Sequence, residues 1–225
     1  PEAMRAFPPD EPAWIVPMYA ADSAFTHGLS HTFVANLRQP RLAPTLVAPA
    51  LPAESLADAS AAHALEEVGG ESGWSGPDVA LVLAAHGTVL EPPRPIDTGR
   101  DATERLCRAI RSRLAPHFGL VVNGWLNHTR GGRWTEPPVE EALQSVADAG
   151  FRRVVYYPYG FLADNAETQL EGLIALRGQP RLEARRVPCL NDSPRLARLL
   201  ADQIASLAVE GASPVVGHLG RAPSR

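Results

Sequence analysis

Apolar runs alternate with amphipathic segments from residue 79 onward, and this alternation restricts the fold more than any other feature of the chain. The apolar runs have the length of buried strands and lie at Val79–Ala85, Leu120–Trp125, Val154–Tyr157 and within Arg181–Pro188. The segments that follow them repeat apolar residues at helical intervals, as Leu106, Ile110 and Leu114 do. Strands that alternate with helices predict an α/β fold with a parallel sheet and helical crossovers.

A shorter version of the same pattern precedes these units. It predicts two strands and two helices, at Trp14–Tyr19, Phe25–Leu37, Thr45–Pro49 and Ala53–Glu67. An internal repeat links the two parts: the sequence of Gln39–Leu42 recurs at Gln179–Leu182, and Ala21–Thr26 resembles Ala163–Thr168 in the same order. We therefore expect the N-terminal part to be the last two units of a second copy, whose first two units this sequence lacks.

The segment between the two parts is rich in Gly and Ser, which predicts a linker at residues 67–77. On this basis residues 1–66 form a partial N-terminal half and residues 78–209 form a complete α/β half. Residues 210–225 are predicted to be a disordered tail.

Composition argues against two classes of partner. The formal net charge of −4 disfavours nucleic acid, and no apolar run approaches the roughly 18 residues of a membrane-spanning helix. Cys107 and Cys189 are not in a CxxC arrangement, so neither a disulfide scaffold nor a cysteine-held metal cluster is predicted. We expect a protein of the reducing cytoplasm.

Polar and aromatic residues follow the ends of the predicted strands, where ligand crevices form in parallel sheets. His86 directly follows the first strand and precedes a glycine. Its neutral imidazole could hold a metal or accept a proton near pH 7. The second strand ends in Trp125-Leu126-Asn127-His128, and the third is followed by Tyr159 and Phe161.

Three acids come next in the chain. Asp164, Glu167 and Glu171 are spaced i, i+3 and i+7, so an α-helix that begins near Asp164 would place their carboxylates on one face. Carboxylate and imidazole groups are both ligands of divalent metals. We expect Glu167 to face His86 if the first and third strands are neighbours in the sheet.

These residues resemble the class II tetrapyrrole chelatases and, among them, the ferrochelatases. The resemblance covers residues 78–207 well and residues 14–57 weakly. The motifs that carry it are Ala85-His86-Gly87, the pair Trp125 and Trp134 with the trailing Pro137, Pro158–Thr168, and Pro188–Pro194.

The resemblance implies two similar four-stranded α/β halves with a porphyrin cleft between them. It implies that His86 and Glu167 are the catalytic pair and that they hold the metal together with Asp164 and Glu171. The substrate-binding residues that it implies are Trp125, Asn127, His128, Trp134, Tyr159 and Phe161. The implied reaction is that of a lyase of heme biosynthesis, with protoporphyrin IX and Fe²⁺ as substrates and no tightly bound cofactor.

Two alternatives stay open at this point. A sirohydrochlorin chelatase that inserts cobalt or iron, for cobalamin or siroheme, shares the fold and the strand-end histidine. The other is a non-enzymatic tetrapyrrole- or metal-binding relic that has lost one wall of its cleft. Phe25 stands where the repeat places the counterpart of Glu167, so the N-terminal part has no such acid. The sequence predicts no oligomeric state.

Overall fold

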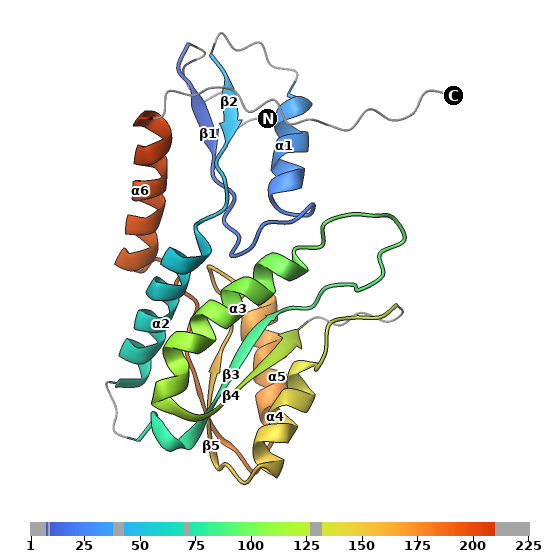
Figure 1. Ribbon diagram of the computed structural model, residues 1–225, viewed down its shortest axis with the longest axis vertical. Coiled ribbons are helices and arrows are strands. Elements are labelled where there is room, and N and C mark those ends of the chain that lie inside the picture. The colour runs from blue at the N-terminus through green and yellow to red at the C-terminus, as the bar shows by residue number, and fades with distance from the viewer. Residues whose placement is uncertain (1–7, 9, 38–42, 70–72, 127–131, 210–225) are drawn as a thin grey trace.

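Two parallel sheets organise the chain in the computed structural model, which describes residues 8, 10–37, 43–69, 73–126 and 132–209 (Figure 1). The larger sheet has four strands in the order β4-β3-β5-β6, all parallel. Their bounds are β3 Gly76–His86, β4 Phe118–Leu126, β5 Arg153–Tyr157 and β6 Glu183–Arg186. The smaller sheet pairs β1 (Ala13–Ile15) with β2 (Thr45–Val47), also in parallel.

Strand β3 is central because its residues are apolar on both faces. Every residue from Val79 to Ala85 is buried, with alternate side chains entering two separate cores. Helices α2 (Ala53–Gly69) and α3 (Arg100–Leu114) contribute to the core on one face. Helices α4 (Val139–Asp148) and α5 (Gly172–Arg177) contribute to the other. The predicted α/β class, with parallel sheets flanked by helices, is confirmed.

The close seating of α4 depends on one glycine in β4. A Cβ atom at Gly124 would lie 2.9 Å from the Cα of Val139, the first residue of the helix. The helix can therefore bring Leu143 and Val146 directly onto the sheet, where both are buried. It ends at Asp148, and Gly150 shortly after it has a φ of +90°, which few other residues adopt.

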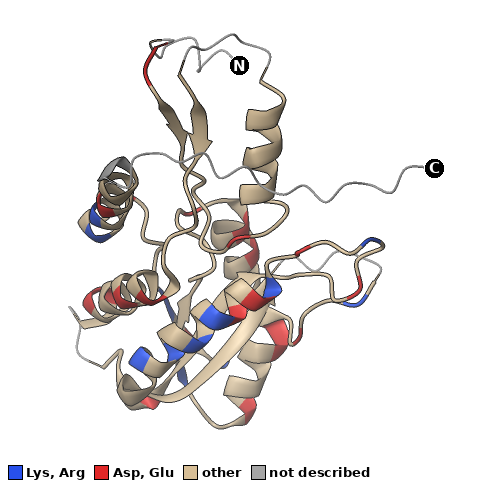
Figure 2. Cartoon of the chain, turned by 45° about the horizontal axis from the view of Figure 1, so that its top comes forward, with Lys and Arg blue, Asp and Glu red and all other residues tan. Residues whose placement is uncertain are grey.

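The structure places α2 with the larger sheet and not with the strands that precede it. Leu56, Ala57 and Ala64 of this helix are buried in the same core as β3 and α3. Arg113 of α3 also donates hydrogen bonds to Asp58 (2.6 Å) and Glu54 (2.9 Å), and Figure 2 shows acidic bands on α2 beside basic bands on α3. The predicted partition at residues 67–77 therefore does not separate two packing units.

Helix α6 (Pro194–Val209) makes the opposite crossing. Figure 1 shows it beside the small sheet, and its Gln203 amide donates to the carbonyl oxygens of Pro49 (2.6 Å) and Ala50 (3.2 Å) just after β2. The last helix of each part thus packs against elements of the other. The predicted tail at residues 210–225 lies outside the described residues.

Helix α1 (His27–Ala35) completes the N-terminal part, which has the order strand, helix, strand, helix. The order is the same in the second part from β5 to α6, so the described elements follow the internal repeat of the sequence. Within the described residues the N-terminal sheet has two strands. Its carboxyl ends and those of the larger sheet both lead into loops that line one cavity.

Candidate active site

His86 is the last residue of β3. It follows the buried residues Val79–Ala85 of that strand, and 44% of its side chain is exposed. Its Nδ1 lies 2.6 Å from the carbonyl oxygen of Gly87. A carbonyl only accepts, so this contact requires the proton to be on Nδ1. In the neutral ring, the lone pair is then on Nε2.

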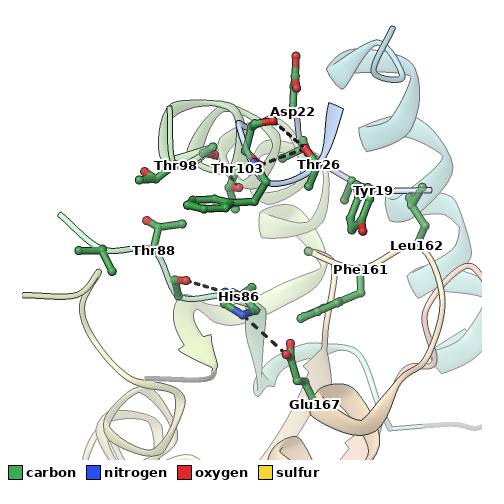
Figure 3. Close-up of a pocket in the computed structure, with 18 of the residues that line it drawn as sticks. Tyr19, Asp22, Thr26, His86, Thr88, Thr98, Thr103, Phe161, Leu162 and Glu167 are labelled. Carbon is green, nitrogen blue, oxygen red and sulfur yellow. Dashed lines mark hydrogen bonds and ion pairs between the residues drawn. The ribbon is translucent and has the colours of Figure 1, made fainter. Parts of the chain in front are cut away.

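Glu167 faces this nitrogen from the neighbouring loop. Its Oε1 lies 3.7 Å from His86 Nε2, and its side chain is 27% exposed (Figure 3). The two meet because β3 and β5 are paired strands, so the loops at their carboxyl ends are adjacent. The ring of Phe161 flanks the imidazole, with centroids 6.5 Å apart. The expected proximity of His86 and Glu167 is therefore confirmed.

The helix that carries Glu167 begins with a π-helical turn, Glu167–Glu171, before α5 continues as an α-helix. Such turns widen the helix and occur often at functional sites. Gly172 follows the turn, where a Cβ atom would lie 2.6 Å from the Tyr156 hydroxyl. This contact seats the turn closely on β5.

The π-helical turn changes which acids share a face. The i, i+3, i+7 argument assumed an α-helix, and the structure places Glu171 outside the cavity that Glu167 lines. Leu170 and Ile174 are apolar residues four positions apart, as on a buried helix face, but they are 61% and 57% exposed.

Asp164 stabilises the loop through side-chain hydrogen bonds. Its Oδ1 accepts from Thr168 Oγ1 (3.1 Å) and from the Arg186 guanidinium, and its Oδ2 accepts from Asn191 Nδ2 (3.0 Å). Burial alone would raise the pKa of this carboxyl, but the hydrogen bonds from Asn191 and Cys189 and the charge of Arg186 lower it below 3.8. Asp164 is ionised and already bound on both oxygens.

The predicted metal set of His86, Glu167, Asp164 and Glu171 is thus not assembled. Within the described part of the chain, no group of three or more His, Cys, Asp or Glu side chains is placed to hold a metal ion. The physical reasons are the π-helical turn, which displaces Glu171, and the hydrogen bonds that occupy Asp164. His86 and Glu167 remain as the pair that the cavity exposes.

The cavity at this pair has a volume of about 810 Å³ and lies between the loops after β1, β3 and β5. Its acidic lining residues are Asp22, Asp164 and Glu167, which line it together with His86, and its lining contains no arginine among the residues that the structure describes. The rest of the wall is largely apolar, with Met18, Tyr19, Phe25, Pro92, Pro93, Ile96, Trp134, Phe161 and Leu162. Such a space accepts a large, flat, apolar molecule.

The structure separates the predicted substrate-binding residues. Trp134 and Phe161 line the cavity, whereas Trp125 (4% exposed) and Tyr159 (1%) do not. Tyr159 is buried beneath α3, with its hydroxyl 3.5 Å from the Thr103 carbonyl oxygen, because the chain turns inward between Pro158 and Gly160. Asn127 and His128 lie outside the described residues.

Sequence reasoning missed the N-terminal wall of the cavity. Met18 and Tyr19 follow β1, and Phe25 is 55% exposed at the start of α1. The internal repeat contained the signal, since it aligns Phe25 with Glu167. Applying the strand-end rule to both copies would have found these residues.

Comparison with known proteins agrees with the geometry. The sequence model of the ferrochelatase family matches residues 3–207. The chain belongs to the ferrochelatase family. A coproporphyrin III ferrochelatase of Mycolicibacterium paratuberculosis is 37% identical over 140 residues, 52% of this chain and 42% of that protein. A ferrochelatase of Stenotrophomonas maltophilia is 31% identical over 136 residues, 57% of this chain and 41% of that protein. The chain therefore spans less than half the length of these relatives.

Solved structures show the same fold at low identity. CbiX, described as the terminal enzyme of siroheme biosynthesis in denitrifying bacteria, has a TM-score of 0.54 and 19% identity over 89% of this chain and 80% of its own. DR2241 of Deinococcus radiodurans, described as structurally similar to chelatases, has a TM-score of 0.56 and 19% identity over 90% of this chain and 42% of its own. The described helices of this ferrochelatase-family chain include none long and apolar enough to cross a membrane.

Proposed function

We propose that this chain carries the catalytic half of a metallochelatase that inserts Fe²⁺ into protoporphyrin IX, with His86 and Glu167 as the catalytic pair. The observation that carries the proposal is the His86–Glu167 contact of 3.7 Å on the lining of a large, mostly apolar cavity. Membership of the ferrochelatase family supports the reaction class.

The two side chains suit the two demands of metal insertion. A porphyrin must lose two pyrrole protons as the metal enters. Nε2 of the neutral His86 imidazole can accept them one at a time, because the half-exposed ring can pass the first proton to solvent before it takes the second. Glu167 offers a carboxylate beside that nitrogen, which stabilises the imidazolium or the arriving cation. One imidazole and one carboxylate bind Fe²⁺ weakly enough for it to leave with the macrocycle.

The cavity lining favours a porphyrin with few carboxylates. Sirohydrochlorin carries eight carboxylates, which would call for arginine forks around the site. The described lining has none and instead places Trp134 and Phe161 on the walls, where they can stack on a flat ring. Coproporphyrin III, the substrate named for the mycobacterial relative, is intermediate, with four carboxylates.

The test is a metal-insertion assay on the full 225-residue chain with Fe²⁺ and each of the three tetrapyrroles, followed by the loss of tetrapyrrole fluorescence. We expect turnover with protoporphyrin IX to exceed that with the other two. His86→Ala should lower turnover by about 100-fold or more while protoporphyrin binding, measured separately, is retained. His117→Ala, at an exposed histidine far along the chain, is the matched control.

Three results would count against the proposal. Faster turnover with sirohydrochlorin would instead indicate a sirohydrochlorin chelatase of siroheme or cobalamin biosynthesis. Near-normal turnover in His86→Ala would show that His86 and Glu167 are not the catalytic pair. Porphyrin binding without any insertion would favour the relic.

A further inference from the structure

A second cavity, of about 410 Å³, lies behind one wall of the first. The wall is a short antiparallel ribbon in which Thr88–Leu90 runs beside Arg133–Thr135, joined by Leu90 N to Arg133 O (2.8 Å) and Thr135 N to Thr88 O (3.0 Å). Side chains alternate across such a ribbon. Trp134 therefore faces the first cavity, whereas Arg133 and Thr135 face the second.

The two cavities differ in charge. The second is lined by four arginines against two glutamates, in a chain whose net charge is −4: Arg100, Arg108, Arg111 and Arg133 against Glu104 and Glu136. The positions 100, 104, 108 and 111 recur at helical intervals, so they share one face of α3. Basic bands along this helix are visible in Figure 2. We name this cavity the basic pocket.

Its acids do not neutralise its arginines. Glu104 contacts both Arg100 (2.7 Å) and Arg108 (3.8 Å), so one carboxylate is divided between two cations. Arg133 pairs with Glu91, 2.7 Å away, and both of these side chains are mostly exposed. Arg111 has no ion pair within 4 Å among the described residues, although it lies one turn from Arg108.

The floor of the pocket adds neutral donors. Cys107 donates its S–H to Asn123 Oδ1 at 3.3 Å, which directs the oxygen of this amide toward the helix. The amide N–H₂ group of Asn123 then has no hydrogen-bond partner in the described structure. Trp125 closes the end of the pocket and keeps its indole N–H on the Glu136 carbonyl, 3.2 Å away.

We propose that the basic pocket binds a small anion with two or more acidic oxygens, either a phosphate or a dicarboxylate. Like charges three or four residues apart on a helix repel, and a bound anion removes that repulsion. Guanidinium forks bind carboxylate and phosphate oxygens in pairs, which suits Arg108 and Arg111 on successive turns. The pocket volume is at the lower end of the range for small-molecule sites. The proposal does not depend on the proposed function.

Isothermal titration of the full chain with inorganic phosphate and with succinate, at constant ionic strength set by chloride, tests the site. We expect saturable one-site binding of at least one of the two anions, and the tighter one identifies the chemical class. Arg108→Gln/Arg111→Gln should weaken that binding by about tenfold or more, because charge-assisted hydrogen bonds are lost. Arg111→Lys keeps the charge but loses the fork, and should weaken binding less.

The matched control is Arg152→Gln/Arg198→Gln, which removes the same charge at exposed arginines outside the pocket. It should leave the affinity within about twofold, because distant surface charges are screened by salt. No saturable binding of either anion at millimolar concentrations overturns the proposal. An equal loss in the control also overturns it, since the effect would then be one of net charge. Thermal unfolding of each variant confirms that it is folded.

Discussion

The two loops on opposite walls of the cavity that contains His86 and Glu167 have related sequences and different side chains. In the loop Ala21–Thr26, the Ser23 and Thr26 hydroxyls are 3.0 Å apart and Ser23 Oγ accepts from Phe25 N (3.1 Å). In the loop Ala163–Thr168, Thr168 N donates to Asn165 Oδ1 (3.0 Å) and Asn165 N to Thr168 Oγ1 (2.9 Å). Side-chain hydrogen bonds close both turns, so the turn does not decide what the loop presents to the cleft.

The difference lies at two positions of the repeat. Phe25 on one wall is replaced by Glu167 on the other, which supplies an apolar surface opposite a carboxylate. Asp22 is mostly exposed and contacts His27, whereas Asp164 is 13% exposed in its side chain and binds Arg186. In the loop Ala163–Thr168 the aspartate is used in structural contacts, and a second acid lines the cavity. In the loop Ala21–Thr26 an apolar side chain lines the cavity instead.

The largest expected effect is the difference in turnover between a variant of Glu167 and a variant of Phe25. Glu167→Gln keeps the shape of the side chain but removes its charge beside His86, so turnover should fall by about 100-fold or more. Phe25→Leu keeps an apolar wall and should alter turnover by less than about fivefold, mainly through KM. Steady-state metal insertion on both variants makes the measurement. Glu171→Gln, outside the cavity, is the control for loss of an acid from the same turn.

The second prediction compares the two aspartates. Asp164→Ala leaves Arg186 and Asn191 without their partner and should lower the free energy of unfolding by about 2–3 kcal/mol. Asp22→Ala removes the contact of a mostly exposed carboxylate with His27 and should cost less than about 1 kcal/mol. Urea denaturation of the two variants gives both values. Equal losses would mean that the two loops are held in the same way.

Much of this comparison could be predicted from the sequence. Alternating strands and helices indicated neighbouring parallel strands, and neighbouring strands bring the residues after His86 and after Tyr157 together. The order of residues in the repeat was enough to identify Phe25 as the counterpart of Glu167. These inferences succeed because period and order along the chain determine sheet contacts directly.

Other features depend on contacts that periodicity does not encode. An apolar helix face does not specify which sheet it covers, so the crossing of α2 and α6 between the two parts was not predicted. Trp125 lies near the end of β4 and Trp134 follows that strand, yet only Trp134 lines the first cavity, because the ribbon with Thr88–Leu90 divides the space. The π-helical turn at Glu167 likewise has no signature in residue spacing.

The third prediction concerns the threonine of each loop. Thr168 is fully buried, and its hydroxyl both donates to Asp164 and accepts from Asn165 N, so Thr168→Val should cost about 1–2 kcal/mol. Thr26 is partly exposed and donates to backbone carbonyls 3.3 Å away, so Thr26→Val should cost about 0.5 kcal/mol. Thermal unfolding of the two variants checks the ratio. At either position, replacing Thr by Ser keeps the hydroxyl and should cost much less stability than replacing it by Val.

The smallest expected effect is a difference in pH response between the two walls. Burial lowers the pKa of His27 below 6.5, His31 lowers it further, and Asp22 and the Pro49 carbonyl only partly offset this. The unfolded chain then binds more protons than the folded one, so stability contributed by neutral His27 is present above pH 6.5 and declines as pH falls through the folded pKa. Asp164 has the same sign, but its lowered pKa confines the loss to pH values below 3.8.

Acidification should therefore loosen α1 before it loosens the turn that carries Glu167. Amide hydrogen exchange, corrected for intrinsic rates, should show α1 losing protection as the pH falls below about 6.5 while α5 keeps its protection. His27→Gln should flatten the response of α1, since glutamine does not titrate. Asp22→Asn should move it to lower pH, because the nearest charge that favours the imidazolium is gone. His117→Gln, at an exposed histidine, should leave the profile of α1 unchanged. If α5 loses protection in the same window as α1, the two walls respond to acid as one unit, and the contrast between His27 and Asp164 does not govern their stability.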